Sequence, residues 1–320
     1  MRSKSARPVL LDTDIGSDVD DAIALVLLLA LSSELDLVAV TTVSGDTALR
    51  ARIASRLLAA AGAGEVEVCA GESLPIAGGR FVHFGHEAEC VFEGPDAHLL
   101  EESAPERIVR AARETEGLEL VAIGPLSNLA RALALDPELP RRVSGLTLMG
   151  GHVREVRIGD HVCAPGIDYN LCSDPAASVR VLGGGFDTTL VTADVTLSTW
   201  ITEAEVAEIE AAGELGGILA EQIRTWTPVK RSLFENLGGT MASDNAAFLH
   251  DPLTVWALAE PGCAHFETLR IVPTIEDGTF RTFEVDPSTG LGTPMRVATS
   301  IDGSTVSRRM VAHLLEFLRG

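Results

Sequence analysis

Five carboxylates lie within ten residues near the start of the chain. The segment 12–21 reads DTDIGSDVDD and holds Asp12, Asp14, Asp18, Asp20 and Asp21. So much negative charge in one loop is unfavourable unless something positive neutralises it, and a helix N-terminus supplies only about half a charge. Carboxylate oxygens are the ligands of Ca²⁺ and Mg²⁺, and Ca²⁺ tolerates the irregular geometry of a loop. The segment therefore predicts a site for a hard divalent cation.

Two other interpretations of this segment stay open. It can be a surface loop whose aspartates cap a helix without any metal, because Asp is favoured at helix N-termini. It can also belong to a phosphatase of the haloacid dehalogenase type in which Asp12 attacks phosphorus, because DxD after a first strand fits that chemistry. An EF-hand is excluded, since the DxDxDG register and the terminal glutamate are missing.

Further polar motifs occur downstream. GPLSN occupies residues 124–128, DYN occupies 168–170, ADVT occupies 193–196 and HDPLT occupies 250–254. With the acidic segment, which continues as DDA, these motifs resemble those of the inosine-uridine type of nucleoside hydrolase. That family has DxDxG followed by DDA, GPLTN, E-aromatic-N, LDVT and HDxLA in the same order. Five ordered motifs over more than 200 residues cover nearly the whole chain and rarely coincide by chance.

The resemblance implies an enzyme that cleaves the N-glycosidic bond of a ribonucleoside with water and uses Ca²⁺ as its cofactor. By position, Asp14 matches the family's general base, which also touches the metal. The other metal ligands fall on Asp21, Asp251 and the backbone carbonyl of Ser127. A cation lowers the pKa of a bound water, so a carboxylate such as Asp14 can complete its deprotonation.

The same resemblance assigns substrate contacts. Asp20 and Asn170 match residues that hydrogen-bond the sugar, and Asp168 stands where the family has a glutamate facing the 5′-hydroxyl. His250 matches a histidine near the base that helps the leaving group depart as a neutral species. His86 matches a second histidine, on the base-binding loop. Rigid binding of the sugar would favour the oxocarbenium-like transition state over the ground state.

The chain departs from the family pattern at several positions. Asp18 is an additional carboxylate that could take either role of Asp20, and Asp46 replaces an asparagine near the sugar. An ionised acid cannot donate a hydrogen bond, so Asp46 would accept one from a ribose hydroxyl or mark a changed substrate. A family asparagine has no clear counterpart, and Asp160 is the nearest polar candidate. Asp46 and Asp168 therefore leave a further interpretation open, a calcium-dependent ribose or nucleoside binding protein without turnover.

Aromatic residues surround these motifs. Trp226 and Phe234 lie where family members have a mobile segment that covers the base, although helix packing is the preferred interpretation of both. Tyr169 is expected to pack inside the DYN segment. The loop Gly71–Pro95 has no periodicity, and loops of this length in a compact domain are often lids or binding loops.

Alternating strands and helices must position these residues. The predicted strands are Val9–Leu11, Leu35–Val43, Val66–Ala70, Leu118–Ile123, Leu146–Met149 and Thr188–Val191. The predicted helices are Ala22–Leu31, Ala48–Ala61, Pro105–Glu114, Ser127–Leu135 and Pro175–Val181. Strands that are apolar throughout suit a parallel sheet covered by helices on both faces. We therefore expect an open, mostly parallel, Rossmann-like α/β fold with its site beyond the carboxyl ends of the strands.

The pattern changes after Ile201. Two or three helices come first, and then Phe266–Pro273, Arg281–Val285 and Met295–Thr299 are predicted to form a small antiparallel edge before a closing helix from Ser304. The 320 residues suffice for one large domain, and no linker interrupts the pattern. We expect a single domain, residues 1–320.

Composition limits the partners. The chain has 46 acidic and 25 basic residues and a net charge of -21, which would repel nucleic acids and anionic membranes. The longest apolar run, Ala22–Leu31, is about half of the ~20 residues that span a membrane. No signal peptide core follows the N-terminus, and the five cysteines lack CxxC spacing. We therefore expect a cytoplasmic enzyme of small-molecule nucleosides, and the resemblance implies a homodimer or homotetramer.

Overall fold

One sheet of ten strands forms the centre of the described part of the chain. The computed structural model describes residues 6–90, 92–158, 161–163, 165, 168–236, 239, 241–276 and 279–320. The strands of the sheet are β1 (Arg7–Thr13), β2 (Leu35–Thr42), β3 (Glu67–Ala70), β4 (His98–Leu100), β5 (Glu119–Ala122), β6 (Gly145–Met149), β9 (Thr188–Val191), β12 (Ala264–Glu276), β13 (Thr279–Val285) and β14 (Thr293–Ile301). Their order across the sheet is β13-β12-β14-β9-β6-β5-β1-β2-β3-β4.

The sheet confirms the predicted α/β class. Each neighbouring pair from β4 to β14 is parallel, and β12 is antiparallel to both β13 and β14. Every strand predicted from the sequence is present. One detail differs, because β14 also pairs in parallel with β9 and so joins the antiparallel edge to the main sheet.

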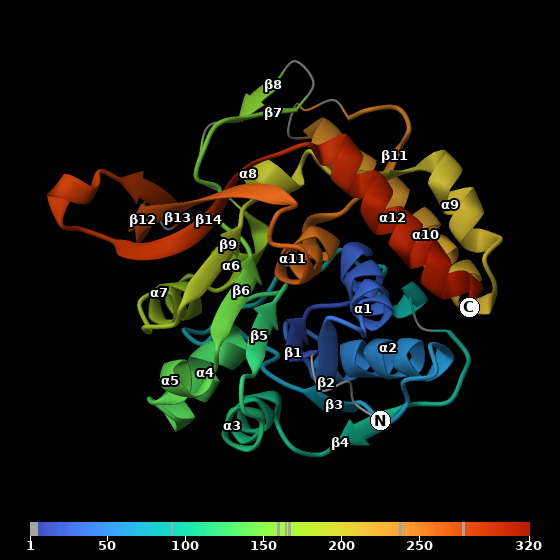
Figure 1. Cartoon of the computed structure of the whole chain (residues 1–320), viewed down its shortest axis with the longest axis horizontal. Coiled ribbons are helices and arrows are strands. Elements are labelled where there is room, and N and C mark those ends of the chain that lie inside the picture. Colours follow the sequence, from blue (N-terminus) through green and yellow to red (C-terminus); the bar gives the residue numbers. More distant parts are fainter. Residues whose placement is uncertain are drawn as a thin grey trace.

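Helices cover both faces of the sheet (Figure 1). On one face lie α1 (Asp20–Ala30), α2 (Thr47–Ala60), α9 (Glu203–Glu210), α10 (Glu214–Asn236), α11 (His250–Ala259) and α12 (Gly303–Arg319). On the other lie α3 (Ala104–Glu114), α4 (Ser127–Leu135), α5 (Leu139–Arg142) and α7 (Pro175–Leu182). Side chains of β1 alternate between the two cores, since Val9 and Leu11 join the first and Leu10 joins the second. This alternation is why the strand is apolar throughout.

Further short elements complete the fold, and the sequence predicted neither these nor β4 and α5. They are η1 (Glu87–Cys90), β7 (Val156–Ile158), β8 (His161–Cys163), α6 (Tyr169–Ser173), α8 (Ala193–Thr196), β10 (Trp200–Thr202), β11 (Asn245–Phe248) and η2 (Pro287–Thr289). Each spans five residues or fewer, too few for a periodic pattern to show. Within the described residues, no helix combines the length and the apolar character that crossing a bilayer would require.

Helix α1 is a deeply buried part of the scaffold that carries the acidic segment. Leu25 in its centre is 0% exposed, whereas Leu135 at the end of α4 is 56% exposed. Leu25→Ala should lower the free energy of unfolding by about 3 kcal/mol, because it removes buried methyl groups and leaves a cavity. Leu135→Ala should change it by less than about 0.5 kcal/mol. Chemical denaturation of both variants measures the difference, and equal effects would contradict the burial of α1.

Candidate active site

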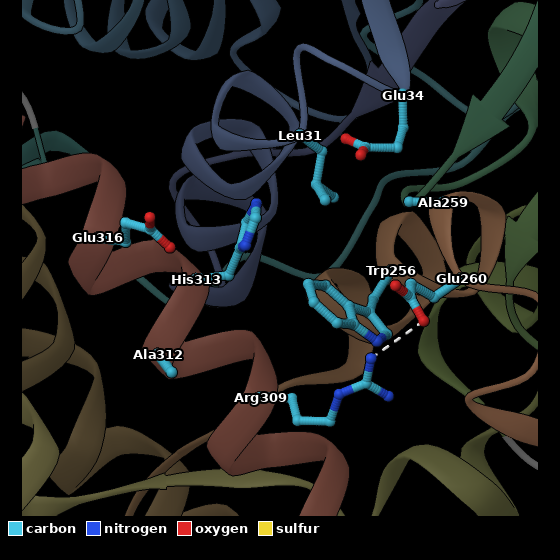
Figure 2. Close-up of a pocket in the computed structure, with 9 residues that line it drawn as sticks. All are labelled: Leu31, Glu34, Trp256, Ala259, Glu260, Arg309, Ala312, His313 and Glu316. Atoms are coloured by element: carbon cyan, nitrogen blue, oxygen red, sulfur yellow. Dashed lines mark hydrogen bonds and ion pairs between the residues drawn. The ribbon is translucent and has the colours of Figure 1, made fainter.

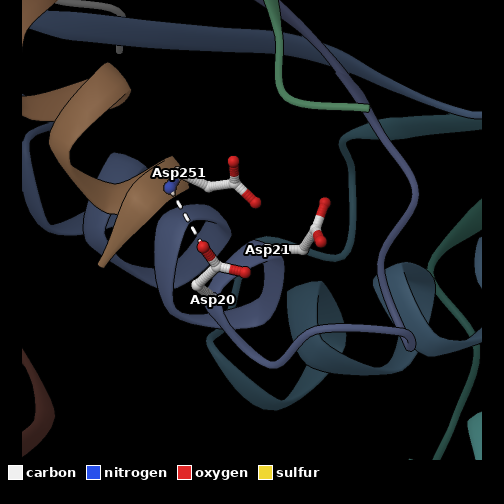
Figure 3. A group of neighbouring side chains, drawn as sticks. All are labelled: Asp20, Asp21 and Asp251. Atoms are coloured by element: carbon white, nitrogen blue, oxygen red, sulfur yellow. Dashed lines mark hydrogen bonds between the residues drawn. The ribbon is translucent and has the colours of Figure 1, made fainter. Parts of the chain in front are cut away.

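Three buried carboxylates meet where two helices begin. Asp20 and Asp21 open α1, and Asp251 is the second residue of α11. One ligand oxygen of each lies within 4.8 Å of the other two (Figure 3). The backbone N–H of Asp251 donates to Asp20 Oδ2 at 3.2 Å, which ties the two helix starts together. Thr13 Oγ1 donates to Asp21 Oδ1 and fixes that carboxylate.

The electrostatics of this group call for a cation. Burial raises the pKa of Asp20, Asp21 and Asp251 well above the usual value, and repulsion between neighbouring carboxylates raises it further. Charged together, these groups are stable only beside positive charge, and the two helix N-termini supply part of it. An all-oxygen donor set of carboxylates fits a hard divalent ion such as Ca²⁺ or Mg²⁺. The residues present therefore fit the metal that the sequence predicts.

Asp14 lies beside this group but not within it. Its charge raises the pKa of Asp20, Asp21 and Asp251. Burial raises the pKa of Asp14 itself to about 6, against the opposing effect of the Arg50 guanidinium. At neutral pH the carboxylate is therefore mostly ionised and able to accept a proton.

Arg50 holds the loop that carries Asp14. Its guanidinium donates to the carbonyls of Asp14, Ile15 (2.8 Å) and Ser44 (2.6 Å), and to Ser17 Oγ (2.8 Å). The side chain is almost completely buried. One arginine thus joins the loop after β1 to the loop after β2, which limits the positions that Asp14 can adopt.

Asp12 lies beneath the site as an anchor. Its Oδ1 accepts from Thr41 Oγ1 at 2.6 Å and from Asn128 Nδ2 at 2.7 Å. Asn128 also donates to Thr42 O and accepts from the N–H of Glu72. The last residue of GPLSN therefore binds together the ends of neighbouring strands. Both bonds go to Oδ1, and Oδ2 is buried without a hydrogen-bond partner among the described residues.

The rest of GPLSN approaches Asp14 closely. A Cβ atom on Gly124 would lie 2.9 Å from both the backbone nitrogen and Oδ1 of Asp14. Ser127 Oγ donates to Asp174 Oδ2 at 2.6 Å, and Asp174 Oδ1 accepts from the N–H of Ala177 in α7. This buried pair fixes the backbone of Ser127, whose carbonyl is a predicted metal ligand.

His250 is held by the ADVT motif. Its Nδ1 lies 2.6 Å from Thr196 Oγ1, and its ring centroid lies 5.2 Å from that of Phe248. Burial lowers the pKa of His250 to about 4, and the charge of Lys230 lowers it further. The imidazole is therefore neutral at neutral pH.

His86 belongs to an aromatic cluster over the acidic segment. Its Nε2 lies 2.7 Å from Ser17 O, so this nitrogen is the donor, and its Nδ1 has no partner among the described residues. Its ring packs against Trp226 at 5.4 Å, and Phe84 contacts both rings. Tyr169 donates to Val82 O at 2.9 Å and so holds this loop in place.

The predicted sugar contacts have different surroundings. Asn170 Nδ2 donates to Ile123 O at 2.9 Å, just beyond β5, and lies 3.3 Å from the carbonyl of Met149 in β6. Asp168 is buried and accepts from the N–H of Leu171 as the cap of α6, and burial raises its pKa to about 6. Asp46 is exposed and caps α2 through the N–H of Leu49.

The structure thus brings only part of the predicted metal set into one group. Asp21 and Asp251 lie together, and the third member is Asp20, which the sequence placed at the sugar, instead of Asp14. Asp160 lies outside the described residues. Phe234 packs against Phe248 at 5.1 Å.

Sequence reasoning missed two cations of the site. Arg50 gave no signal, because it sits in an ordinary helical pattern. Lys230 could have been found by composition, since the chain has only two lysines, Lys4 and Lys230, among its 25 basic residues. Its position in the middle of a helix, next to the segment that contains Trp226, is the other clue.

A pocket lies at the other ends of the same helices. Leu31, just beyond α1, lines it together with Trp256, Ala259 and Glu260 from the end of α11, and α12 closes it (Figure 2). An ion pair between Arg309 and Glu260, 3.0 Å long, crosses this pocket. It contains none of the predicted site residues, so the acidic group at the helix starts is the candidate active site.

The fold and the acidic group define an α/β protein with a candidate carboxylate metal site at the carboxyl edge of its sheet. The model of the family described as inosine-uridine preferring nucleoside hydrolase matches residues 9–308. The chain belongs to this family. It is therefore a nucleoside hydrolase, an enzyme that cleaves the N-glycosidic bond of ribonucleosides.

Individual relatives agree with this family. A probable uridine nucleosidase 2 from Arabidopsis thaliana is 28% identical and covers 97% of this chain and 98% of its own length. A pyrimidine-specific ribonucleoside hydrolase, RihA, from Citrobacter koseri is 32% identical over 80% of each protein. The solved structure of a purine-preferring ribonucleoside hydrolase from Gardnerella vaginalis has a TM-score of 0.82 at 24% identity, covering 98% of this chain and 99% of that one. The last comparison shows the shared fold.

The raised pKa values predict how the stability of the metal-free protein depends on pH. Burial raises the pKa of Asp12 to about 7 and that of Asp14 and Asp168 to about 6, from 3.8. The folded state then binds more protons than the unfolded state between pH 4 and 7, so stability falls as pH rises through this window. The melting temperature with a chelator should be several degrees lower at pH 7.5 than at pH 5. Asp12→Asn should flatten the fall, and a rise with pH would contradict the burial of these acids.

The contact of Gly124 with Asp14 predicts a sensitive position. Gly124→Ala should lower kcat/KM for a nucleoside by about 100-fold, because displacing a catalytic group by about 1 Å has effects of this size. The matched control is Gly262→Ala, where a Cβ meets nothing within 4 Å. Steady-state kinetics of both variants, with melting temperatures as a check on folding, measure the effect. Full activity of Gly124→Ala would show that Asp14 does not need its present position.

Proposed function

We propose that the protein hydrolyses ribonucleosides to ribose and free base with Ca²⁺ as its cofactor. The observation that carries this proposal is the buried group of Asp20, Asp21 and Asp251, which joins the starts of α1 and α11 within reach of the charge of Asp14. Uridine is the first substrate to test, because two relatives are named for uridine or pyrimidine nucleosides.

Asp14, Asp21, Asp251 and the Ser127 carbonyl would hold the ion, and Asp20 faces the same space. When bound, Ca²⁺ supplies positive charge that polarises water and sugar hydroxyls and stabilises the ionised carboxylates. This charge also makes Asp20 available as an acceptor for a ribose hydroxyl. The raised pKa of the acidic group in the absence of an ion supports this assignment.

In the proposed reaction, some residues act on the water and the sugar, and others act on the base. Asp14 accepts a proton from the attacking water, and Arg50 keeps its loop in place. Asp20 and Asn170 orient the sugar, with Asp168 toward the 5′-hydroxyl and Asp46 as a contact at the outer edge. His250 lies on the base side, where Thr196 fixes its ring, and His86 with Trp226 covers the base.

Two substitutions that suggested loss of turnover have local structural roles. Asp46 caps α2, and Asp168 caps α6. An aspartate serves a helix cap as well as an asparagine does. Their presence is therefore compatible with turnover, which favours the enzyme over a binding protein.

The remaining features of the proposal concern the whole molecule. We propose a single domain, residues 1–320, that acts in the cytoplasm as a homodimer or homotetramer. The described cysteines are free, and three of them, Cys69, Cys90 and Cys263, are buried, which suits a reducing compartment. The net charge of -21 argues against nucleic acids and anionic membranes as partners. Light scattering of the purified protein measures its oligomeric state.

The test is release of free base from uridine, inosine, adenosine, guanosine and cytidine, with Ca²⁺ and after chelation. The wild type should hydrolyse at least one of them, and chelation should abolish turnover until Ca²⁺ is restored. Asp14→Asn and Asp251→Asn should each lower kcat by at least about 1,000-fold, because one removes the base and the other a metal ligand. The control Asp286→Asn changes an exposed carboxylate near η2 and should be fully active.

The outcomes separate the alternatives. Near-normal activity in Asp14→Asn or Asp251→Asn would contradict the assignment of Asp14 as the base or of Asp251 as a metal ligand. Binding of Ca²⁺ and ribose without turnover would identify a binding protein. Release of phosphate from an aryl phosphate, lost in Asp12→Asn, would identify a phosphatase.

A further inference from the structure

Lys230 is a buried cation that the proposed function leaves without a task. It is 1% exposed, and it is the only lysine in the described part of the chain. Its Nζ donates to Asn245 Oδ1 at 2.6 Å and to Asn245 O at 3.0 Å. Both acceptors belong to one neutral residue, so a bonded carboxylate does not balance the charge of the ammonium. Burying an ammonium without a bonded carboxylate costs free energy, so packing alone does not explain why a lysine occupies this position.

The helix that carries Lys230 presents one buried stripe to the site. Gln222, Trp226 and Lys230 are four residues apart on α10 and therefore share a face. Gln222 donates to Cys90 O at 2.9 Å, and the Trp226 ring packs against His86. The stripe begins at the loop that covers the acidic segment and runs toward β11.

The far end of this stripe reaches the second histidine. Lys230 Nζ lies 5.3 Å from the centroid of the Phe248 ring, and that ring lies 5.2 Å from the ring of His250. The charge of Lys230 also lowers the pKa of His250, and Asp18 and Asp20 are near enough to favour the charged form of Lys230. The ammonium is therefore near enough to both the acidic segment and His250 to act on each.

An ammonium has three N–H groups, and Asn245 takes two of them. The third has no acceptor among the described residues. This N–H group can donate a proton to the departing base. The base needs a proton because cleavage of the C1′–N bond leaves the bonding electrons on it. Burial lowers the pKa of Lys230 to about 8, so the group is protonated at neutral pH and yet releases a proton readily.

We infer that Lys230 is the proton donor to the departing nucleobase, an inference that rests on the proposed function. As the C1′–N bond breaks, its electron pair passes to the base, and a ring nitrogen of the base takes one proton from Nζ. Water gives its oxygen to C1′ and one proton to Asp14. The proton on Asp14 passes to solvent, and the Lys230 amine regains one from solvent. The sum is nucleoside and water giving ribose and neutral base.

Lys230→Met tests this role, because methionine keeps the length of the side chain and removes the proton. The substrates are uridine, whose base is a poor leaving group, and 4-nitrophenyl β-ribofuranoside, whose phenolate departs without a proton. Lys230→Met should lower kcat for uridine by about 100- to 1,000-fold and for the aryl riboside by less than about threefold. Its melting temperature and its Ca²⁺ requirement with the aryl riboside should match those of the wild type.

Two further variants make the test specific. Lys230→Gln should behave as Lys230→Met does, which covers the case in which one of them fails to fold. Arg224→Met removes a surface cation from the same helix, where it pairs with Glu210, and should leave both rates unchanged.

Several results would overturn the inference. Equal losses on the two substrates would make Lys230 a structural residue, and an unchanged rate on uridine would exclude it from the reaction. If the wild type hydrolyses none of the five nucleosides in Ca²⁺, the proposed function itself fails, and if it hydrolyses another nucleoside but not uridine, that nucleoside replaces uridine in this test. If the wild type hydrolyses both substrates but the variants do not separate them, only the role of Lys230 fails.

Discussion

Repulsion between buried carboxylates is the constraint on which the rest of this structure depends. Asp20, Asp21 and Asp251 share one small volume, and the charge of Asp14 acts on all three. Water screens little of this repulsion, because burial removes the solvent. The fold places two helix N-termini beside these carboxylates, and the remaining negative charge favours a bound cation. The buried carboxylates that favour a bound cation therefore also destabilise the fold. Acids with strongly shifted pKa values are common at functional sites.

The surroundings of this group are built to resist that repulsion. Arg50 joins the loops after β1 and β2 by donating to backbone carbonyls, so it adds positive charge without occupying a carboxylate oxygen. Asn128 and Thr41 bind Asp12 beneath the site, and Gly124 gives Asp14 room that any side chain would fill. Polar residues that follow different strands therefore act as one support, because the carboxyl ends of parallel strands meet at one edge.

The site also has an electrostatic direction. Carboxylates gather where the helices α1 and α11 begin, and the buried ammonium of Lys230 on α10 acts on both Asp20 and His250. Hydrolysis of a nucleoside develops positive charge on the sugar and negative charge on the base. Carboxylates would stabilise the first charge, and in our proposal Lys230, whose charge acts on His250, stabilises the second.

The sequence by itself determined the parallel α/β sheet, because strands buried on both faces must be apolar throughout. Its ordered motifs also indicated the family. Local spacing also placed Asp20 and Asp21 at a helix start. Only the tertiary structure decided that Asp20 joins Asp251, that Asn128 binds Asp12, and that Lys230 is buried beside Phe248. These facts depend on contacts between residues far apart in the chain. A spacing pattern carries the period of one element, whereas such contacts depend on how whole elements pack.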